Sequence, residues 1–387
     1  MNFDLTDEQQ LFRSTVREWV ENEAPKSYAN ELERREHEYP FELWDKMTEA
    51  GFHGISVPEE YGGQGGDIVM QMILARELSR SLAGLTWVWG NTSFAGAKSV
   101  GLYGSDEQKR ELLPKIAAGQ ARCTIGFTEP GGGTDLLGAM RTHAEKVDGG
   151  WRVNGAKTWC TQAHVADYIL LLVRTNKNVE KRHQGLTLFL MPRELEGVTI
   201  SHIPKLGMRA VSSCDVGLDD VVIEDKWLLG EPDRAWYMLL PTLNNERILL
   251  AAFCVGILDG ILEDALAYAK DRRAFGRPIG QFQTMQTYIA DIAMMRRQAE
   301  LLTYNAAWLQ ANGRECFQET SFAKVCASDY ANKAADLGIQ ILGGMGYAAE
   351  TDMQRYWRDS RLFRIGPVTN EMARNSIAEQ LGLPRSF

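Results

Sequence analysis

The stretch Asp148-Gly-Gly-Trp-Arg-Val-Asn-Gly155 marks a change in the character of the chain, because a glycine turn leads straight into alternating apolar and polar residues. Such a pattern is typical of a turn followed by a β-strand. Three apolar or β-branched runs of strand length follow it, at Tyr168 to Arg174, Leu186 to Met191 and Val221 to Ile223. We therefore expect a middle β domain over residues 121–234.

Helical patterns lie on both sides of this region. Upstream, over residues 1–120, Thr6 with Gln9 and Ser105 with Gln108 each form the capping-box signal of a helix start. Downstream, over residues 235–387, the helical period returns in long segments near 236–271, 282–311, 317–345 and 370–381. The order helices, strands, helices has no βαβ alternation, so we expect an α+β fold and not a parallel doubly wound sheet.

The charge balance limits the kinds of partner. The 387 residues carry a formal net charge of -9, so the surface as a whole repels nucleic acid and anionic membranes, and an anionic ligand needs a local basic pocket. The longest apolar stretches are too short to cross a bilayer, and Met1 to Ala24 is charged and amphipathic, unlike a signal peptide. We expect a cytoplasmic protein that binds neither nucleic acid nor membrane.

The sequence offers no well-supported metal-ligating, nucleotide-binding or nucleophilic motif. The six cysteines include no C-x-x-C pair, which suits a reducing compartment, and the six histidines show no metal-ligand spacing, so we expect no metal site. The glycine clusters fit neither the G-x-G-x-x-G nor the Walker pattern. Ser321-Phe-Ala-Lys324 matches S-x-x-K, but no Lys-Thr-Gly accompanies it, so we expect no nucleophilic serine there.

Longer motifs occur in a fixed order over nearly the whole chain: Pro58-Glu-Glu-Tyr-Gly-Gly63, Thr128-Glu-Pro-Gly-Gly-Gly-Thr-Asp135, Asn154-Gly-Ala-Lys-Thr-Trp159 and Arg272-Arg-Ala-Phe275. Together they resemble the acyl-CoA dehydrogenase family, whose T-E-P-G-A-G-S-D the second motif is similar to. The resemblance implies an N-terminal helical domain, a central β-barrel domain and a C-terminal four-helix bundle, usually assembled as a homotetramer (a dimer of dimers).

The resemblance also implies FAD as the cofactor. In similar proteins the segments that match Phe127, Thr128, Trp159 and Thr161 border the flavin ring, which needs hydrogen-bond donors because charge develops on it during reduction. The segments that hold the adenosine and pyrophosphate part, commonly across a subunit interface, are matched by Arg272, Phe275, Gln283, Gln340, Gly343 and Gly344. Arginine suits phosphate through its fixed charge and fork of donors. Thr369 and Glu371 match residues beside the adenine side, and Thr134 stands where the family has a serine near the thioester.

The catalytic base departs from the commoner family pattern. Removing the α-proton of a thioester requires a carboxylate within reach of that carbon. The family's I-Y-E-G-T-S-E is matched here by Ile365-Gly-Pro367-Val-Thr369-Asn-Glu371, so the usual glutamate is replaced by proline. A second location, found in isovaleryl-CoA and long-chain acyl-CoA dehydrogenases, is matched by Leu243-Asn-Asn-Glu246-Arg247.

Glu246 is therefore the candidate base, with Asn244 and Arg247 as candidate substrate contacts. Burial beside an acyl chain is expected to raise its pKa. The competing interpretation is an exposed glutamate that pairs with Arg247 on a helix surface. Pro367 also lacks the backbone N–H that ordinarily binds the thioester oxygen in relatives. Losing one such donor lowers the stabilisation of the transition state by about 3–4 kcal/mol. Either a neighbouring N–H such as that of Val368 replaces it, the alignment shifts locally, or the reaction differs.

These residues predict FAD-dependent α,β-dehydrogenation of an acyl-CoA, with an electron-transfer flavoprotein as the electron acceptor. One alternative is an enoyl-CoA reductase of the crotonobetainyl-CoA type, because those relatives also lack the C-terminal glutamate. A second is oxidation of an acyl group bound to a carrier protein. A third is a non-catalytic paralogue, against which Trp159, Thr161, Arg272 and Gln283 argue.

Overall fold

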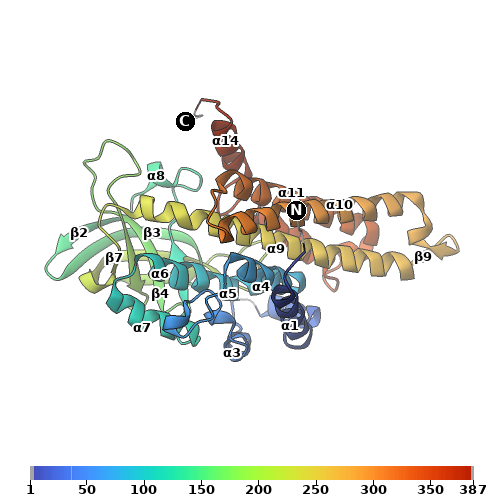
Figure 1. Cartoon of the computed structure of the whole chain (residues 1–387), viewed down its shortest axis with the longest axis horizontal. Helices are drawn as coiled ribbons and strands as arrows, with labels where there is room; N and C mark the ends of the chain where they lie inside the picture. The colour runs from blue at the N-terminus through green and yellow to red at the C-terminus, as the bar shows by residue number, and fades with distance from the viewer. Residues whose placement is uncertain (1–3, 36, 385–387) are drawn as a thin grey trace.

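The computed structural model describes residues 4–35 and 37–384. Helices form the N-terminal part, a sheet forms the middle and helices form the C-terminal part, as the sequence predicts (Figure 1). The N-terminal part contains α1 (Asp7–Glu23), α2 (Lys26–Arg34), α3 (Phe41–Glu49), α4 (Ile68–Ser81), α5 (Ala83–Asn91), α6 (Ser99–Tyr103) and α7 (Asp106–Ala117), with the short turns η1 (Phe52–Gly54) and η2 (Glu59–Tyr61) and the π-helical η3 (Thr92–Lys98).

The middle part is one eight-stranded sheet in the order β6-β7-β3-β2-β4-β5-β8, with β1 beside β4. Most neighbours are antiparallel, and only β1 with β4 and β2 with β4 are parallel among the described strands. This arrangement confirms that the sheet is not doubly wound. Its elements are β1 (Cys123–Gly126), α8 (Leu136–Ala139), β2 (His143–Val147), β3 (Gly150–Thr161), β4 (Tyr168–Arg174), β5 (Leu186–Pro192), β6 (Val198–His202), β7 (Ser213–Glu224), η4 (Asp225–Trp227) and β8 (Leu228–Leu229).

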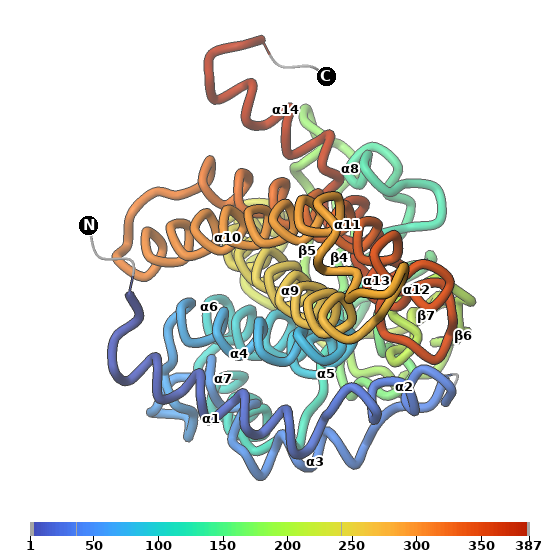
Figure 2. The backbone as a smooth tube through the Cα atoms, turned by 90° about the vertical axis from the view of Figure 1, so that its right-hand side faces the viewer, coloured from blue at the N-terminus to red at the C-terminus, as the bar shows by residue number. Residues whose placement is uncertain are grey.

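Three long helices form the C-terminal bundle, which extends away from the sheet in Figure 1. Their limits lie within three residues of the predicted segments. The C-terminal elements are α9 (Ala235–Asp271), β9 (Arg273–Ala274), β10 (Arg277–Pro278), η5 (Ile279–Gln281), α10 (Gln283–Ala311), α11 (Phe317–Leu342), α12 (Gly344–Tyr347), α13 (Met353–Leu362) and α14 (Asn370–Gln380). Seen along the long axis, α14 projects away from the other helices (Figure 2).

The predicted helix starts carry their caps. Thr6 and Ser105 each accept a hydrogen bond from the third backbone N–H of α1 and α7, and Gln9 and Gln108 complete both capping boxes. Helix α11 ends at Leu342, three residues earlier than predicted, because Gly343 adopts a φ of +61° that continues no right-handed helix. Among the described residues, none of the helices has both the length and the apolarity that crossing a bilayer requires.

Helix α4 joins the two helical parts into one core. The guanidinium of the buried Arg76 donates to Asp259 on α9 (2.7 Å) and to Glu300 on α10 (2.7 Å). At the same crossing, a Cβ on Gly256 would lie 2.2 Å from the Arg76 carbonyl oxygen, so α9 approaches α4 with no room for a side chain. The middle of α9 is thereby fixed against α4, and the helix also packs against β5 and η3.

Candidate active site

Glu246 lies in the fourth turn of α9. Its carboxylate makes no hydrogen bond or ion pair with another described residue. Part of the side chain is exposed, yet protein atoms surround it closely enough that burial raises its pKa to about 7, against the opposing effects of Arg247 and Lys324. A carboxylate with these properties exchanges protons near neutral pH.

Arg247 does not pair with its neighbour, contrary to the helix-surface interpretation. The residue is 7% exposed, and its guanidinium carbon lies 4.6 Å from the centre of the Phe317 ring. Its Nη1 atom is buried and has no hydrogen-bond partner among the described residues. Buried polar atoms are ordinarily hydrogen-bonded, so this donor fits a site whose acceptor comes from outside the chain. Asn244, in contrast, already accepts a hydrogen bond from Thr320 Oγ1 (3.3 Å).

A buried lysine fixes the loop that lacks the usual glutamate. Lys324 on α11 is 1% exposed, and its Nζ donates to the Val368 carbonyl oxygen (2.6 Å) and to Asn370 Oδ1 (2.7 Å). Burial lowers the pKa of Lys324 to about 8. The Val368 N–H has no hydrogen-bond partner in the described part of the chain. This free donor favours the first of the three explanations for Pro367, that a neighbouring N–H replaces the lost one.

The same loop positions the residues that start α14. Thr369 is the N-cap, and its Oγ1 accepts from the Met372 N–H (3.1 Å). Glu371 is exposed in the first turn. Ser321 on α11 donates to the Phe317 carbonyl oxygen (3.0 Å) and Lys324 faces the loop, so the S-x-x-K stretch does not form a nucleophile and base pair.

A second group of predicted residues is held together by a buried ion pair. Lys157 on β3 is 0% exposed, and its Nζ donates to Glu129 Oε1 (2.8 Å) and to the Phe127 carbonyl oxygen (3.1 Å). The Thr158 N–H donates to the Thr128 carbonyl oxygen (2.8 Å). These bonds fix the 127–129 segment against β3. Neither Lys157 nor Glu129 was predicted to be a site residue, although both lie inside the family-like motifs of the sequence.

Trp159 projects out of the sheet at an irregularity in the pairing of β3 with β7 between Lys157 and Cys160. Its φ is +58° and its side chain is 54% exposed, so it is not a core aromatic. Two residues on, the Thr161 carbonyl oxygen accepts from Asn91 Nδ2 (3.1 Å) and from Thr124 Oγ1. An exposed indole on a fixed strand offers a flat apolar face to a ligand. Thr134 is also exposed, in the loop that precedes α8.

The residues predicted for the adenosine and pyrophosphate part lie at element ends in the C-terminal bundle. Arg272 is the C-cap of α9, Phe275 lies in the β9–β10 hairpin and Gln283 begins α10. All three are exposed, and Phe275 is 95% exposed. The Arg272 guanidinium forms no ion pair within residues 4–35 and 37–384. Gln340, Gly343 and Gly344 are exposed at the end of α11, and a Cβ on either glycine would meet no atom within 4 Å.

These features fit FAD. The exposed rings of Trp159 and Phe275 can cover its aromatic ring systems, and the unpaired guanidinium of Arg272 suits its pyrophosphate. The open glycines at 343 and 344 let a cofactor come close to the protein backbone. Within one chain, however, Arg272 lies far from the candidate base. At about 1.5 Å per residue, the continuous helix α9 separates Glu246 from Arg272 by roughly 40 Å.

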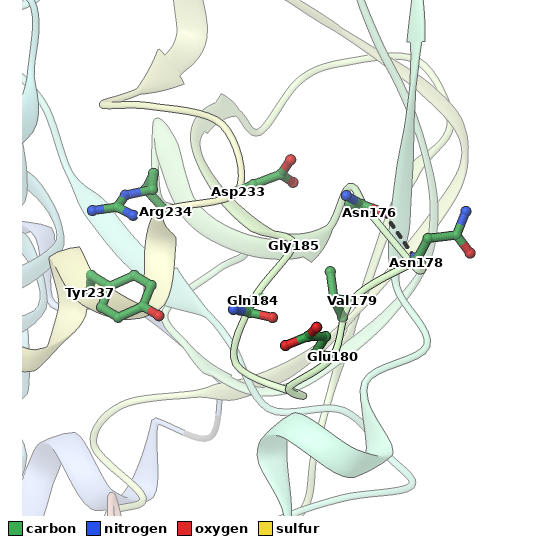
Figure 3. Close-up of a pocket in the computed structure, with 9 residues that line it drawn as sticks. All are labelled: Asn176, Asn178, Val179, Glu180, Gln184, Gly185, Asp233, Arg234 and Tyr237. Atoms are coloured by element: carbon green, nitrogen blue, oxygen red, sulfur yellow. Dashed lines mark hydrogen bonds between the residues drawn. The ribbon is translucent and has the colours of Figure 1, made fainter.

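A separate pocket of about 350 Å³ lies between the β4–β5 loop and the start of α9 (Figure 3). Asp233, Arg234 and Tyr237 line it on one side, and the other side is lined by Asn176, Asn178, Val179, Glu180, Gln184 and Gly185. Its carboxylates, from Glu180 and Asp233, outnumber its one guanidinium, so it does not favour an anionic ligand. None of the predicted site residues lines it.

Family models match almost the entire chain. The models of the acyl-CoA dehydrogenase N-terminal, middle and C-terminal domains match residues 6–120, 124–221 and 233–382. The chain is 36% identical over 383 residues to the probable acyl-CoA dehydrogenase YngJ of Bacillus subtilis, and the alignment covers 98% of this chain and 100% of YngJ. It is 32% identical over 380 residues to subunit CarC of the caffeyl-CoA reductase-Etf complex of Acetobacterium woodii, with 97% and 99% covered.

Solved structures agree with the sequence comparisons. The acyl-CoA dehydrogenase of Geobacillus kaustophilus superposes with a TM-score of 0.94 at 30% identity and covers 99% of this chain and 100% of its own. The prolyl acyl carrier protein oxidase AnaB superposes with a TM-score of 0.91 at 26% identity, with 98% and 100% covered. Both similarities extend over the helical parts and the sheet together.

Proposed function

The chain belongs to the acyl-CoA dehydrogenase family of FAD-dependent oxidoreductases, and from this premise we propose that Glu246 removes the α-proton of an acyl-CoA thioester. The observation that carries the proposal is an unpaired carboxylate whose pKa is raised to about 7 by burial. It lies on a helix, and the loop at 365–371 has no carboxylate in the usual position. We propose a role in fatty acid metabolism on the same basis.

Each residue of the proposed site has a separate role. The Glu246 carboxylate accepts the proton from the α-carbon, and its raised pKa lets it hold that proton. The free Val368 N–H donates to the thioester oxygen, and Lys324 keeps that segment in place through the Val368 carbonyl oxygen. Trp159 and Thr161 border the flavin. Bound FAD supplies the acceptor for the hydride that leaves the β-carbon.

The rate of flavin reduction by substrate is expected to rise with pH. Only the carboxylate form of Glu246 accepts a proton, so the rate climbs about tenfold per pH unit below the pKa of about 7 and levels off above it. The effect on stability has the opposite sign. The folded chain holds this proton more tightly than the unfolded chain does, so the group disfavours folding increasingly as pH rises from about 4.5 towards about 7.

Anaerobic stopped-flow measurement of flavin absorbance across this range provides the check, with Glu246→Asp as a comparison. A rate that does not change from acidic to alkaline conditions would assign proton removal to another group.

We propose that a homotetramer, built as a dimer of dimers, completes each FAD site with Arg272, Phe275 and Gln283 of a second copy. The separation of roughly 40 Å along α9 supports this proposal. Replacing Arg272 with Met is expected to weaken FAD binding roughly tenfold to a hundredfold, because a hydrogen bond to a charged group contributes about 1.5–3 kcal/mol. FAD retained after dilution and gel filtration is the measurement.

The control is Arg110→Met on α7, whose guanidinium is well exposed and forms an ion pair with Asp106 at 3.8 Å. Equal FAD retention in both variants would remove Arg272 from the cofactor site. A protein that is monomeric in solution and still binds one FAD per chain would contradict the shared site.

The reaction could run as dehydrogenation or as reduction, because the similar protein CarC is named as a subunit of a caffeyl-CoA reductase-Etf complex. We propose dehydrogenation as the main direction, with an electron-transfer flavoprotein as acceptor. Anaerobic titration of the purified yellow protein with saturated acyl-CoA esters is expected to bleach the flavin. No bleaching by any saturated ester, together with reoxidation of chemically reduced protein by an enoyl-CoA, would favour reduction instead.

The similarity to AnaB keeps a carrier-protein substrate as the other candidate. Bleaching by an acyl group on a carrier protein but by none of the free CoA esters would identify that substrate. We also propose a cytoplasmic location, because the six cysteines are all free thiols that suit a reducing compartment.

A further inference from the structure

Three side chains from separate segments meet at one end of the sheet. His202 ends β6 and is the direct cross-strand partner of Cys214 on β7. Cys214 in turn lies opposite Cys160 on β3, and His164 lies in the turn that follows β3. The sheet order β6-β7-β3 therefore brings two imidazoles and one thiol together, although they are far apart in sequence.

The distances between their ligand atoms suit a shared ion. One ligand atom from each residue lies within 4.8 Å of the others. The Cys214 Sγ is 3.7 Å from His164 Nδ1 and 4.0 Å from His202 Nδ1. With Zn–S near 2.3 Å and Zn–N near 2.0–2.1 Å, tetrahedral coordination separates sulfur from nitrogen by about 3.6 Å. The two sulfur–nitrogen distances therefore come within a few tenths of an ångström of this value, while the two imidazole nitrogens would have to approach each other by roughly an ångström.

The three residues differ in how far they are buried. The thiol is fully buried, His164 is partly buried and His202 is exposed, so one side is open to solvent. His164 turns its Nδ1 atom towards the thiol, so Nδ1 is its candidate ligand atom, and the buried Nε2 on the other side of the ring has no hydrogen-bond partner among the described residues. The His37 ring, from the segment between α2 and α3, stacks on His202 with centroids 4.4 Å apart.

We propose that His164, His202 and Cys214 bind a divalent transition-metal ion, with Zn²⁺ as the best match. Borderline-soft zinc accepts imidazole and thiolate together and commonly takes four ligands in a tetrahedron. Binding replaces the thiol proton, which leaves to solvent, with a sulfur–zinc bond. Three protein ligands leave the fourth position for water. The ion would tie β6, β7 and the turn after β3 together, and through His37 it would stiffen the contact with the N-terminal helices.

Zinc binding is tested on the FAD-loaded full chain. After dialysis against a chelator, zinc is added, excess is removed and the metal is counted by mass spectrometry. We expect one zinc per chain, a zinc X-ray absorption spectrum with one sulfur and two nitrogen neighbours, and a melting temperature that rises with zinc. Cys214→Ser and His202→Asn should both lose the ion, and the exposed position of His202 keeps the second variant foldable.

The matched controls are Cys326→Ser and His143→Asn, which lie outside the cluster and should retain the ion. Retained FAD and an unchanged circular dichroism spectrum establish that each variant is folded. Absence of stoichiometric zinc in the wild-type chain, or equal zinc in the cluster variants and the controls, would overturn the proposal.

Discussion

Replacing Glu246 with Gln is expected to lower the rate of flavin reduction by acyl-CoA about 10²- to 10⁴-fold, the usual contribution of a positioned general base. The amide keeps the size of the side chain but cannot accept the α-proton. Because Glu246 makes no hydrogen bond or ion pair with another described residue, the change breaks no such contact, so folding and FAD content should be preserved. Stopped-flow absorbance under anaerobic conditions measures the rate.

The control for this variant is Glu145→Gln, an exposed glutamate on β2 with the same change of chemistry. It should bleach at the wild-type rate. Undiminished bleaching in Glu246→Gln would show that another group takes the proton. A colourless Glu246→Gln protein would instead indicate a structural role for the carboxylate.

Replacing Lys157 with Met is expected to have the largest effect on stability. The change leaves the Glu129 carboxylate, which is 5% exposed, without its cation, and removing one partner of a buried pair costs about 3–5 kcal/mol. The Phe127 carbonyl oxygen loses a donor as well. The 127–129 segment should loosen from β3, so FAD retention should fall together with the free energy of unfolding measured in urea.

The comparison variant is Lys115→Met on α7, which removes an exposed pair with Glu111. Exposed helical pairs of this spacing contribute only about 0.3–0.5 kcal/mol. A Lys157 variant as stable as the Lys115 variant would mean that the buried pair does not hold the segment.

The regular elements were predictable because periodic apolar residues determine them. Helices α9, α10 and α11 and strand β4 follow such patterns and were found near their predicted limits. Helix α13 was not predicted, because buried charged residues stand among its buried apolar ones and obscure the hydrophobic period. The buried Arg355 donates to the Ser81 carbonyl oxygen, and the buried Asp359 accepts from the Met208 N–H. No hydrophobic period reveals such contacts.

The residues of the candidate site were likewise predictable only in part. Glu246 and Trp159 were identified from their motifs, but the exposure of Trp159 depends on a pairing irregularity in β3 that a sequence pattern does not show. Lys157 and Lys324 were missed as positioning residues because lysine is ordinarily exposed, and here each is buried with polar partners on another segment. The cluster of His164, His202 and Cys214 depends on strand order, which spacing along the chain cannot encode.

The most direct measurement is a structure of the FAD-loaded protein with a bound saturated acyl-CoA or an unreactive analogue of it. We predict that a Glu246 carboxylate oxygen lies about 3–3.5 Å from the α-carbon, with the flavin on the opposite face of the acyl chain. The Val368 N–H should point to the thioester oxygen. A Glu246 side chain turned away from the α-carbon, with a different carboxylate or no carboxylate beside it, would contradict the mechanism.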